Sequence, residues 1–450
     1  MRQALTYRPL LLAPLVTALL LSACAKKEEI FEGERFDVRT PLAEAIPDAG
    51  VEEGANADTP QNRSVALRLP KIQNRASWPQ RASGPDHYPG HLSLGADLTR
   101  LWSANIGTGN TTRTRLSSEP VVAAGMVYTM DANSRVMAHS LIGAPVWSVD
   151  LTPGNDKAGE VSGGSLAFHE GVIYAGTGFG ELVALNAADG TKRWTQKLNA
   201  PVTAAPTISG GTAYVVSRDN RAWAIRTSNG RVLWQQQSTS ADAAIFGGAS
   251  PAIAGRYVIL PFSSGELVAA LTKNGLRIWS VAVSGSRRGE GRSNIGDITG
   301  DPVVTSSRIY AANQAGRLTA MTRRDGERIW TATEGSLSPV LPIDNSVFLV
   351  SDKGQLIRLD ARNGDVIWAE DLPRYGKEKK RRNAYTHFGP ILAGGHLLVA
   401  SSDGKLRRFD PVSGALVGEV DIPGGAASQP VVVDNVLYVL SQKGQLHAFK

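Results

Sequence analysis

The stretch GELVALNAADGTKRW, residues 180–194, carries the pattern that decides the fold. Apolar residues alternate after Gly180, the pair Asp189-Gly190 interrupts them, and Trp194 lies four residues after the second glycine. Alternation predicts a half-buried β-strand, and an Asx-Gly pair predicts a tight turn into the next strand. The stretch therefore predicts a β-hairpin.

The same pattern recurs along most of the chain. Tryptophan occurs at positions 102, 147, 194, 234, 279, 330 and 368, at intervals of 38 to 51 residues. A glycine lies four residues before each of the last six. A further copy has Gly418 in place of the tryptophan, and a truncated copy ends at Lys450. Internal repeats of this length indicate a solenoid, a propeller or another array.

Each repeat contains two more strand signals before its hairpin. The first is a strand led by a proline, such as Pro206. The second, nearer the hairpin, is a β-branched or aromatic segment such as residues 172–174. Four short strands in about 44 residues are typical of one blade of a β-propeller. Small residues such as Ala184 suit tight packing, and we expect each tryptophan to lie between neighbouring sheets.

The number of copies predicts how the ring closes. Seven complete copies run from about residue 115 to 422, and the eighth, which begins at Pro430, lacks its last strand. Residues 98–106, with Trp102, form a strand without a preceding turn. We therefore predict an all-β fold, an eight-bladed β-propeller of four-stranded antiparallel blades over residues 98–450. The N-terminal strand completes the C-terminal blade. Seven blades is the alternative.

Residues 1–23 indicate a lipoprotein signal peptide. Two arginines precede an apolar run, residues 10–21, which is shorter than the roughly 20 residues that a membrane-spanning helix needs. The run ends in LSAC, which resembles the bacterial lipobox; the resemblance implies cleavage before Cys24 and lipidation of its thiol. Ala25, rather than aspartate, follows. By the usual sorting rule this implies a lipid anchor on the periplasmic face of the outer membrane.

Two segments connect this anchor to the ring. Residues 24–77 are polar and rich in charge, which predicts a flexible, lipidated tether. Residues 78–97 begin with a Trp-Pro pair and are rich in Gly, Pro and His, and we expect them to form an irregular strap against the ring.

The net charge of +7 does not indicate a nucleic-acid partner. Six basic residues and one acidic residue lie in the single run 374–382, between the sixth and seventh copies. A nucleic-acid-binding protein spreads its positive charge over a face. The run is either a solvated surface or a contact for anionic lipid or for an acidic partner.

Repeats of the form Gly-x-Leu-x-Ala-Leu…Asp-Gly-x-x-x-Trp resemble the quinoprotein-type repeat, over about residues 98–450. Two families use eight of them: the pyrroloquinoline-quinone dehydrogenases, and the BamB lipoproteins that accompany BamA in the outer-membrane β-barrel assembly (BAM) complex. The dehydrogenases hold quinone with a vicinal Cys pair, calcium ligands and a stacking Trp. This chain has a single cysteine and lacks the long insertions that build their pocket.

The features of the chain therefore resemble the BamB family more closely. This resemblance implies a non-enzymatic scaffold without a cofactor or metal, whose partners are BamA, other subunits of the complex and nascent outer-membrane β-barrel proteins. A periplasmic quinone-dependent dehydrogenase is the alternative. We assign no catalytic residue, because the seven histidines show no ligand spacing and no serine lies in a nucleophile elbow.

The resemblance also places partner-binding residues in two connections between blades. In the family, these loops carry an apolar-apolar-Arg cluster and two acids that touch BamA. Ala243 and Ile245 fall on the apolar positions and Phe246 on the arginine, whereas Asp297 falls on one acid and Thr299 on the other. Phe246 and Thr299 depart from the family's pattern. We expect the two loops to be spatial neighbours.

Overall fold

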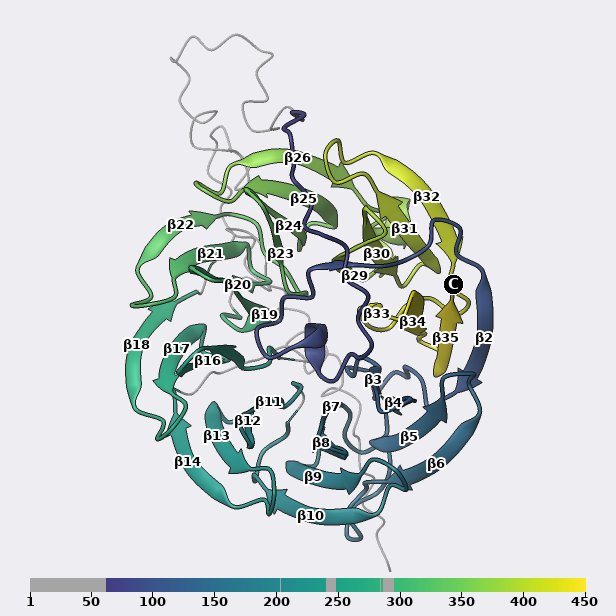
Figure 1. Ribbon diagram of the computed structural model, residues 1–450, viewed down its shortest axis with the longest axis vertical. Helices are drawn as coiled ribbons and strands as arrows, with labels where there is room; N and C mark the ends of the chain where they lie inside the picture. Colours follow the sequence, from purple (N-terminus) through teal and green to yellow (C-terminus); the bar gives the residue numbers. More distant parts are fainter. Residues whose placement is uncertain (1–61, 203, 240–247, 284, 286–294) are drawn as a thin grey trace, which may run out of the picture. The chain divides into compact units, whose positions relative to one another are not determined.

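The computed structural model describes residues 62–202, 204–239, 248–283, 285 and 295–450, which belong to the unit Asp58–Lys450. Eight antiparallel sheets surround a central channel, with the first strand of each at the channel and the last at the rim (Figure 1). The eight-bladed propeller is thereby confirmed, and the seven-bladed alternative is excluded.

We number the blades in chain order and give the strands of each from channel to rim. The first blade is β3 (Val121–Ala123), β4 (Met126–Met130), β5 (Arg135–Ser140) and β6 (Pro145–Asp150). The second is β7 (Gly164–His169), β8 (Val172–Thr177), β9 (Glu181–Asn186) and β10 (Lys192–Lys197). The third is β11 (Thr207–Ser209), β12 (Thr212–Ser217), β13 (Arg221–Arg226) and β14 (Val232–Gln237). The fourth is β15 (Ala252–Ala254), β16 (Tyr257–Pro261), β17 (Glu266–Leu271) and β18 (Arg277–Ala282).

The second half of the ring follows the same plan. The fifth blade is β19 (Ile298–Val304), β20 (Arg308–Asn313), β21 (Arg317–Thr322) and β22 (Arg328–Ala332). The sixth is β23 (Leu341–Ile343), β24 (Ser346–Val350), β25 (Gln355–Asp360) and β26 (Val366–Asp371). The seventh is β29 (His387–Ala393), β30 (His396–Ser401), β31 (Lys405–Phe409) and β32 (Leu416–Asp421). The eighth is β33 (Val431–Val433), β34 (Val436–Leu440), β35 (Gln445–Phe449) and β2 (Arg100–Asn105).

The two ends of the ring meet in the eighth blade, as the sequence predicts. Strand β2 pairs antiparallel with β35, from Arg100 opposite Phe449 to Asn105 opposite Gln445. Beyond these strands, the backbones of Thr99 and Lys450 exchange hydrogen bonds of 2.8 and 2.9 Å. The ladder therefore leaves no open edge between the first and last repeats.

Each repeat tryptophan joins its blade to the next one. Its ring lies against the glycine of the following blade's outer turn, so close that a Cβ on that glycine would lie 2.6–3.0 Å from the nearest atom. The pairs are Trp102–Gly143, Trp147–Gly190, Trp194–Gly230, Trp234–Gly275, Trp279–Gly326, Trp330–Gly364 and Trp368–Gly414. In most pairs the indole N–H also donates to a carbonyl of the next blade, as from Trp194 to Thr227 at 3.0 Å.

Each of these turns needs a glycine for two reasons. Between β9 and β10 the turn spans five residues rather than a two-residue hairpin loop, and Gly190 has a φ of +75°. A side chain at such a φ is strained, and here it would also collide with the tryptophan. The Asx-Gly pair is therefore correct as a turn signal, whereas its main role is to receive the neighbouring blade.

The seventh blade replaces the tryptophan by a different contact. Gly418 lies at the tryptophan position, opposite Arg408 of β31. The guanidinium of Arg408 lies over Gly418 and donates to the carbonyl of Ala96, in the segment that enters β2. Because the outer turn of the eighth blade is split between the two ends of the ring, there is no turn glycine to receive an indole.

Residues 62–97 form the strap. It includes η1 (Arg81–Ser83), which lies at the centre of the ring, and β1 (His91–Leu92), which pairs parallel with β29 (Figure 1). Contacts begin at Asn62 and Arg63, which bond to β26. The segment 62–77, assigned to the tether from its polarity, therefore lies on the ring as well, because bonds to its backbone compensate for its few apolar residues.

The strap caps the inner strands of successive blades. These strands have one edge at the channel, where an unpaired N–H would be buried. Equivalent N–H groups of the first five blades donate to the strap, and the equivalent residue of the sixth, Pro342, has no N–H. The bonds run from Val122 to Trp78, Phe168 to Pro79, Ile208 to the side chain of Gln80, Ile253 to Pro85, and Val304 to Asp86, at 2.6–3.0 Å.

We predict that Gly275→Ala lowers the free energy of unfolding by more than Gly125→Ala does. The φ angles are +73° and +74°, so the backbone strain of about 1–2 kcal/mol is common to both. Only at position 275 would the new methyl carbon lie 2.7 Å from the Trp234 ring; around Gly125 the described residues leave 4 Å free.

Urea denaturation of the two variants beside the wild type measures the difference. Equal destabilisation would contradict the docking of the tryptophan on the turn.

Candidate partner-binding face

The ring has two unlike faces. Turns between the first and second strands lie at one end of the channel, and the connections between blades lie at the other. The strap covers the first end, where Asp344 accepts from the backbone of Arg68 and Asp434 donates its N–H to Arg75. We call this end the strap face, and the opposite end, which includes the connections 333–340 and 422–430, the connection face.

A hollow of about 420 Å³ opens on the connection face at the mouth of the channel. Leu116, Leu337 and Phe388 supply its apolar lining, and Arg81 and Glu119 supply charge. Leu337 is 45% exposed, although it is a large apolar residue on a connection. The mouth therefore combines exposed apolar surface with a polar floor.

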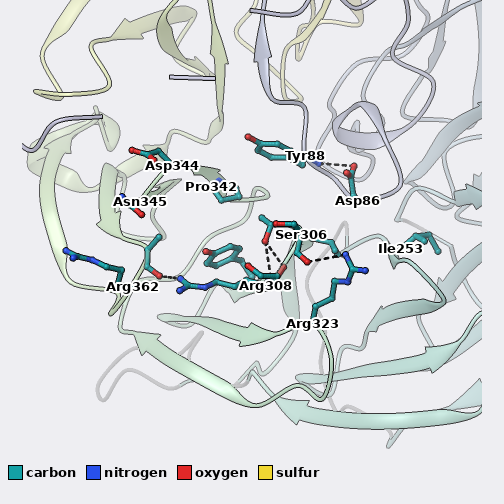
Figure 2. Close-up of a pocket in the computed structure, with 15 residues that line it drawn as sticks. Asp86, Tyr88, Ile253, Ser306, Arg308, Arg323, Pro342, Asp344, Asn345 and Arg362 are labelled. Atoms are coloured by element: carbon teal, nitrogen blue, oxygen red, sulfur yellow. Dashed lines mark hydrogen bonds between the residues drawn. The ribbon is translucent and has the colours of Figure 1, made fainter. Parts of the chain in front are cut away.

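A larger hollow, of about 640 Å³, lies on the strap face between the fourth, fifth and sixth blades (Figure 2). Its arginines are engaged within the ring. Arg308 donates to the carbonyl of Ala361, Arg323 donates to that of Ser306 at 3.4 Å, and Arg362 pairs with Asp360. The first contact joins the fifth blade to the sixth, and the other two lie within one blade, so all three serve the structure of the ring.

An ionic cluster closes the channel beneath the connection face. Arg81, from η1, pairs with Asp301 and lies 3.7 Å from a carboxylate oxygen of Glu119. Asp301 also accepts the N–H of Ser250 at 2.6 Å. Each acid directly precedes a proline: Pro120 comes just before β3, and Pro302 lies within β19. Sequence reasoning missed this cluster, because only the position of two acids before Pro120 and Pro302 signals it.

Burial sets the protonation of the cluster. It raises the pKa of Glu119, and the charge of Arg81 opposes this shift. For Arg81, burial acts to lower the pKa, but Asp301 and Glu119 together hold it above its ordinary value. The strap is therefore bound to the channel wall by a permanent cation that lies between two acids. Burial disfavours the charged form of one of these acids, Glu119.

Two of the predicted partner-binding residues are described, and both face inward. Asp297 is 2% exposed and lies 3.7 Å from Arg218, and Thr299 donates to the carbonyl of Ser336 at 2.7 Å. The first contact connects the end of the fourth-to-fifth connection with the third blade, and the second connects the start of β19 with the next connection. Binding of a partner through the two side chains stays a prediction.

The other predicted residues lie outside the described part of the chain. They are Cys24, Ala243, Ile245 and Phe246. The described ends of the two predicted loops do lie side by side, since the backbone N–H of Ser250 donates to the carboxylate of Asp301 at 2.6 Å.

A buried histidine of the seventh blade, His387, is held by structural contacts. The ring of His387 contacts the hydroxyl of Ser401 at 2.6 Å and the carbonyl of Pro373 at 2.9 Å, and burial lowers its pKa. Ser401 is fully buried. Among the described residues, His, Cys, Asp and Glu form no group of three or more that could hold a metal ion. The same residues include no helix that is long and apolar enough to cross a membrane.

Comparison with known protein families assigns the chain. The family described as outer membrane protein assembly factor BamB matches residues 132–370 and 378–450, which cover most of the ring. The chain belongs to the BamB family. The BamB protein of Yersinia pestis is 25% identical over 365 residues, which are 78% of this chain and 88% of that protein.

Solved structures share the BamB-type ring. The structure of BamB from Moraxella catarrhalis matches 79% of this chain and 98% of its own, with a TM-score of 0.63 and 20% identity. A quinohemoprotein alcohol dehydrogenase from Comamonas testosteroni also reaches a TM-score of 0.63, at 15% identity over 83% of this chain and 80% of its own. Likeness at these identities shows the fold alone, and both families have it.

We predict that Glu119→Gln makes stability less dependent on pH. Because burial raises the pKa of Glu119 above its ordinary 4.5, the stabilisation linked to its proton is present below pH 4.5 and is lost as pH rises through the folded-state pKa. The glutamine keeps the size without the charge. Relative to the wild type, the variant should therefore gain stability as pH rises.

Thermal unfolding of both proteins at a series of pH values, from below 4.5 upward, measures the effect. Parallel pH profiles would contradict a raised pKa at Glu119.

Proposed function

We propose that the protein is a non-enzymatic scaffold lipoprotein of the outer-membrane β-barrel assembly machinery. It docks on BamA through the connection face and assists the folding and insertion of outer-membrane β-barrel proteins. The match of the BamB family across the ring carries this proposal. The lipobox before Cys24 supports an anchor in the outer membrane, facing the periplasm.

The connection face supports the docking. The strap covers the opposite end of the channel, whereas the connection face exposes Leu337 beside the hollow. The predicted loop with Ile245 and Phe246 belongs to a connection between the fourth blade and the preceding one. An apolar centre within a polar surround is the usual arrangement of a binding hot spot.

A quinone enzyme is the competing function, and the residues present do not fit its cofactor. The resemblance to those enzymes implies a quinone over the central channel, held by a vicinal Cys pair. Here η1 lies in the channel, Arg81 is engaged by Asp301 and Glu119, and the single cysteine, Cys24, lies outside the ring sequence. We therefore derive no redox step for this chain.

Replacing Ile245 and Phe246 together by aspartate should abolish co-purification with BamA from solubilised outer membranes. Two buried charges would replace the apolar anchor of the interface, whereas the ring would keep its melting temperature. Ile142→Asp is the matched control, because Ile142 is 80% exposed on an outer turn of the strap face. It should leave co-purification intact.

Two results would contradict this assignment. A large fall in the melting temperature of the double variant would mean that the two residues belong to the core. Co-purification of a well-folded double variant would mean that BamA docks elsewhere.

Cys24→Ser should prevent lipidation, because only the thiol accepts the lipid group. We expect unprocessed or soluble protein after membrane fractionation, whereas Ala25→Ser, which keeps the cysteine, should fractionate with the wild type. Stable anchoring needs more than one acyl chain, as lipoproteins have. A normal mature mass and normal membrane fractionation of Cys24→Ser would contradict the anchor.

A further inference from the structure

The basic run forms a hairpin that leaves the ring between the sixth and seventh blades. Its strands are β27 (Tyr375–Lys377) and β28 (Arg382–Ala384), and η3 (Glu378–Lys380) lies between them. Tyr375 pairs with Ala384, and the backbone of Tyr385 donates to Arg374 at the base. Residues 376–384 are exposed throughout. The hairpin therefore holds its side chains in solvent.

Among the described residues, most of the positive charge of this hairpin has no acidic partner. Arg374 lies 3.4 Å from Asp371, and Glu378 accepts the backbone N–H of Tyr375. Across the described part of the chain, no carboxylate lies within ion-pair distance of the other five cations. These are Lys377, Lys379, Lys380, Arg381 and Arg382. The family match is interrupted at residues 371–377, where the hairpin begins.

The segment that leads to the proposed anchor leaves the ring next to this hairpin. The side chain of Asn62 donates to Glu370 at 3.0 Å and accepts the N–H of Ala369 at 3.1 Å. Glu370 is four residues before Arg374. Residues 24–61 contain ten acidic and four basic residues, so the tether itself is repelled by an anionic surface. Electrostatic attraction to such a surface must come from the ring.

We propose that the basic hairpin, residues 374–384, binds the anionic phospholipid headgroups of a membrane surface. Lysine and arginine side chains near such a surface are each attracted to its phosphates, and five of them lie on one short hairpin. Tyr375 and Tyr385 at its base suit the level of the headgroups. With the acyl group of Cys24, the hairpin makes a second membrane signal and brings the sixth and seventh blades to the membrane.

The test uses the mature chain from Ala25 onward, made without an acyl group, so it requires neither the lipid anchor nor a protein partner. Its binding is measured by co-sedimentation with vesicles of phosphatidylcholine, with and without phosphatidylglycerol. We expect binding only to the anionic vesicles, decreasing with added salt. Replacing residues 379–382 by glutamine should lower the partition constant more than about tenfold.

The matched control removes the same charge from blades that lie across the ring from the hairpin. Lys192, Arg193, Lys197 and Arg231 are exposed on or beside the outer strands of the second and third blades. Their replacement by glutamine should leave binding within about twofold of the wild type, because they lie far from the proposed contact. Lys379→Arg with Lys380→Arg, which keeps the charge, should also bind.

Three outcomes would overturn the proposal. They are equal losses in the hairpin and control variants, wild-type binding that does not depend on phosphatidylglycerol, and no binding to anionic vesicles. The last outcome would leave an acidic protein surface as the partner of the hairpin. The hairpin is itself a connection between blades and so belongs to the connection face. None of the three outcomes bears on BamA, because docking on BamA is measured separately by co-purification.

Discussion

The ring depends on one contact, repeated seven times, between a tryptophan on an outer strand and a glycine in the next blade's outer turn. The indole covers the turn and, in most pairs, donates to one of its carbonyls, as from Trp194. In most blades the indole also packs on an aromatic ring of its own blade, as with Trp194 and Tyr174 at 5.8 Å between centroids. Such aromatic pairs contribute roughly 0.5–1.5 kcal/mol beyond their buried area. Because the contact always runs from one blade to the next, it makes a ring rather than a stack of independent sheets.

Where the repeat is broken, the N-terminal strap supplies what is missing. At Gly418 the guanidinium of Arg408 takes the tryptophan's place and bonds to Ala96. In the sixth blade, Arg358 is buried and donates to the carbonyls of Val65 and Ala66. The strap then caps the inner strands and plugs the channel through Arg81. One face is thereby sealed, and the connection face is left for a partner.

The periodic features were predictable from the sequence, and the single contacts were not. The spacing of glycine and tryptophan predicts the eight blades, and Trp102 without its own turn predicts closure at β2. The position of residues 62–77 on the ring could not be predicted, because it depends on single residues, such as Arg358, that bind partners hundreds of positions away in the sequence. The same holds for Arg81 and Glu119. The inward direction of Asp297 and Thr299 depends on Arg218 and Ser336, which no pattern connects with them.

The proposed function requires that the connection face, not the strap face, meets the assembly machinery. Leu337 and Ile142 allow a direct comparison, since both are exposed apolar residues, at 45% and 80%, on opposite faces of the ring. A photo-reactive amino acid placed at each position in cells reports which face has a protein within reach. We expect a crosslink to BamA from position 337 and none from position 142. A BamA crosslink from position 142 alone would contradict docking through the connection face.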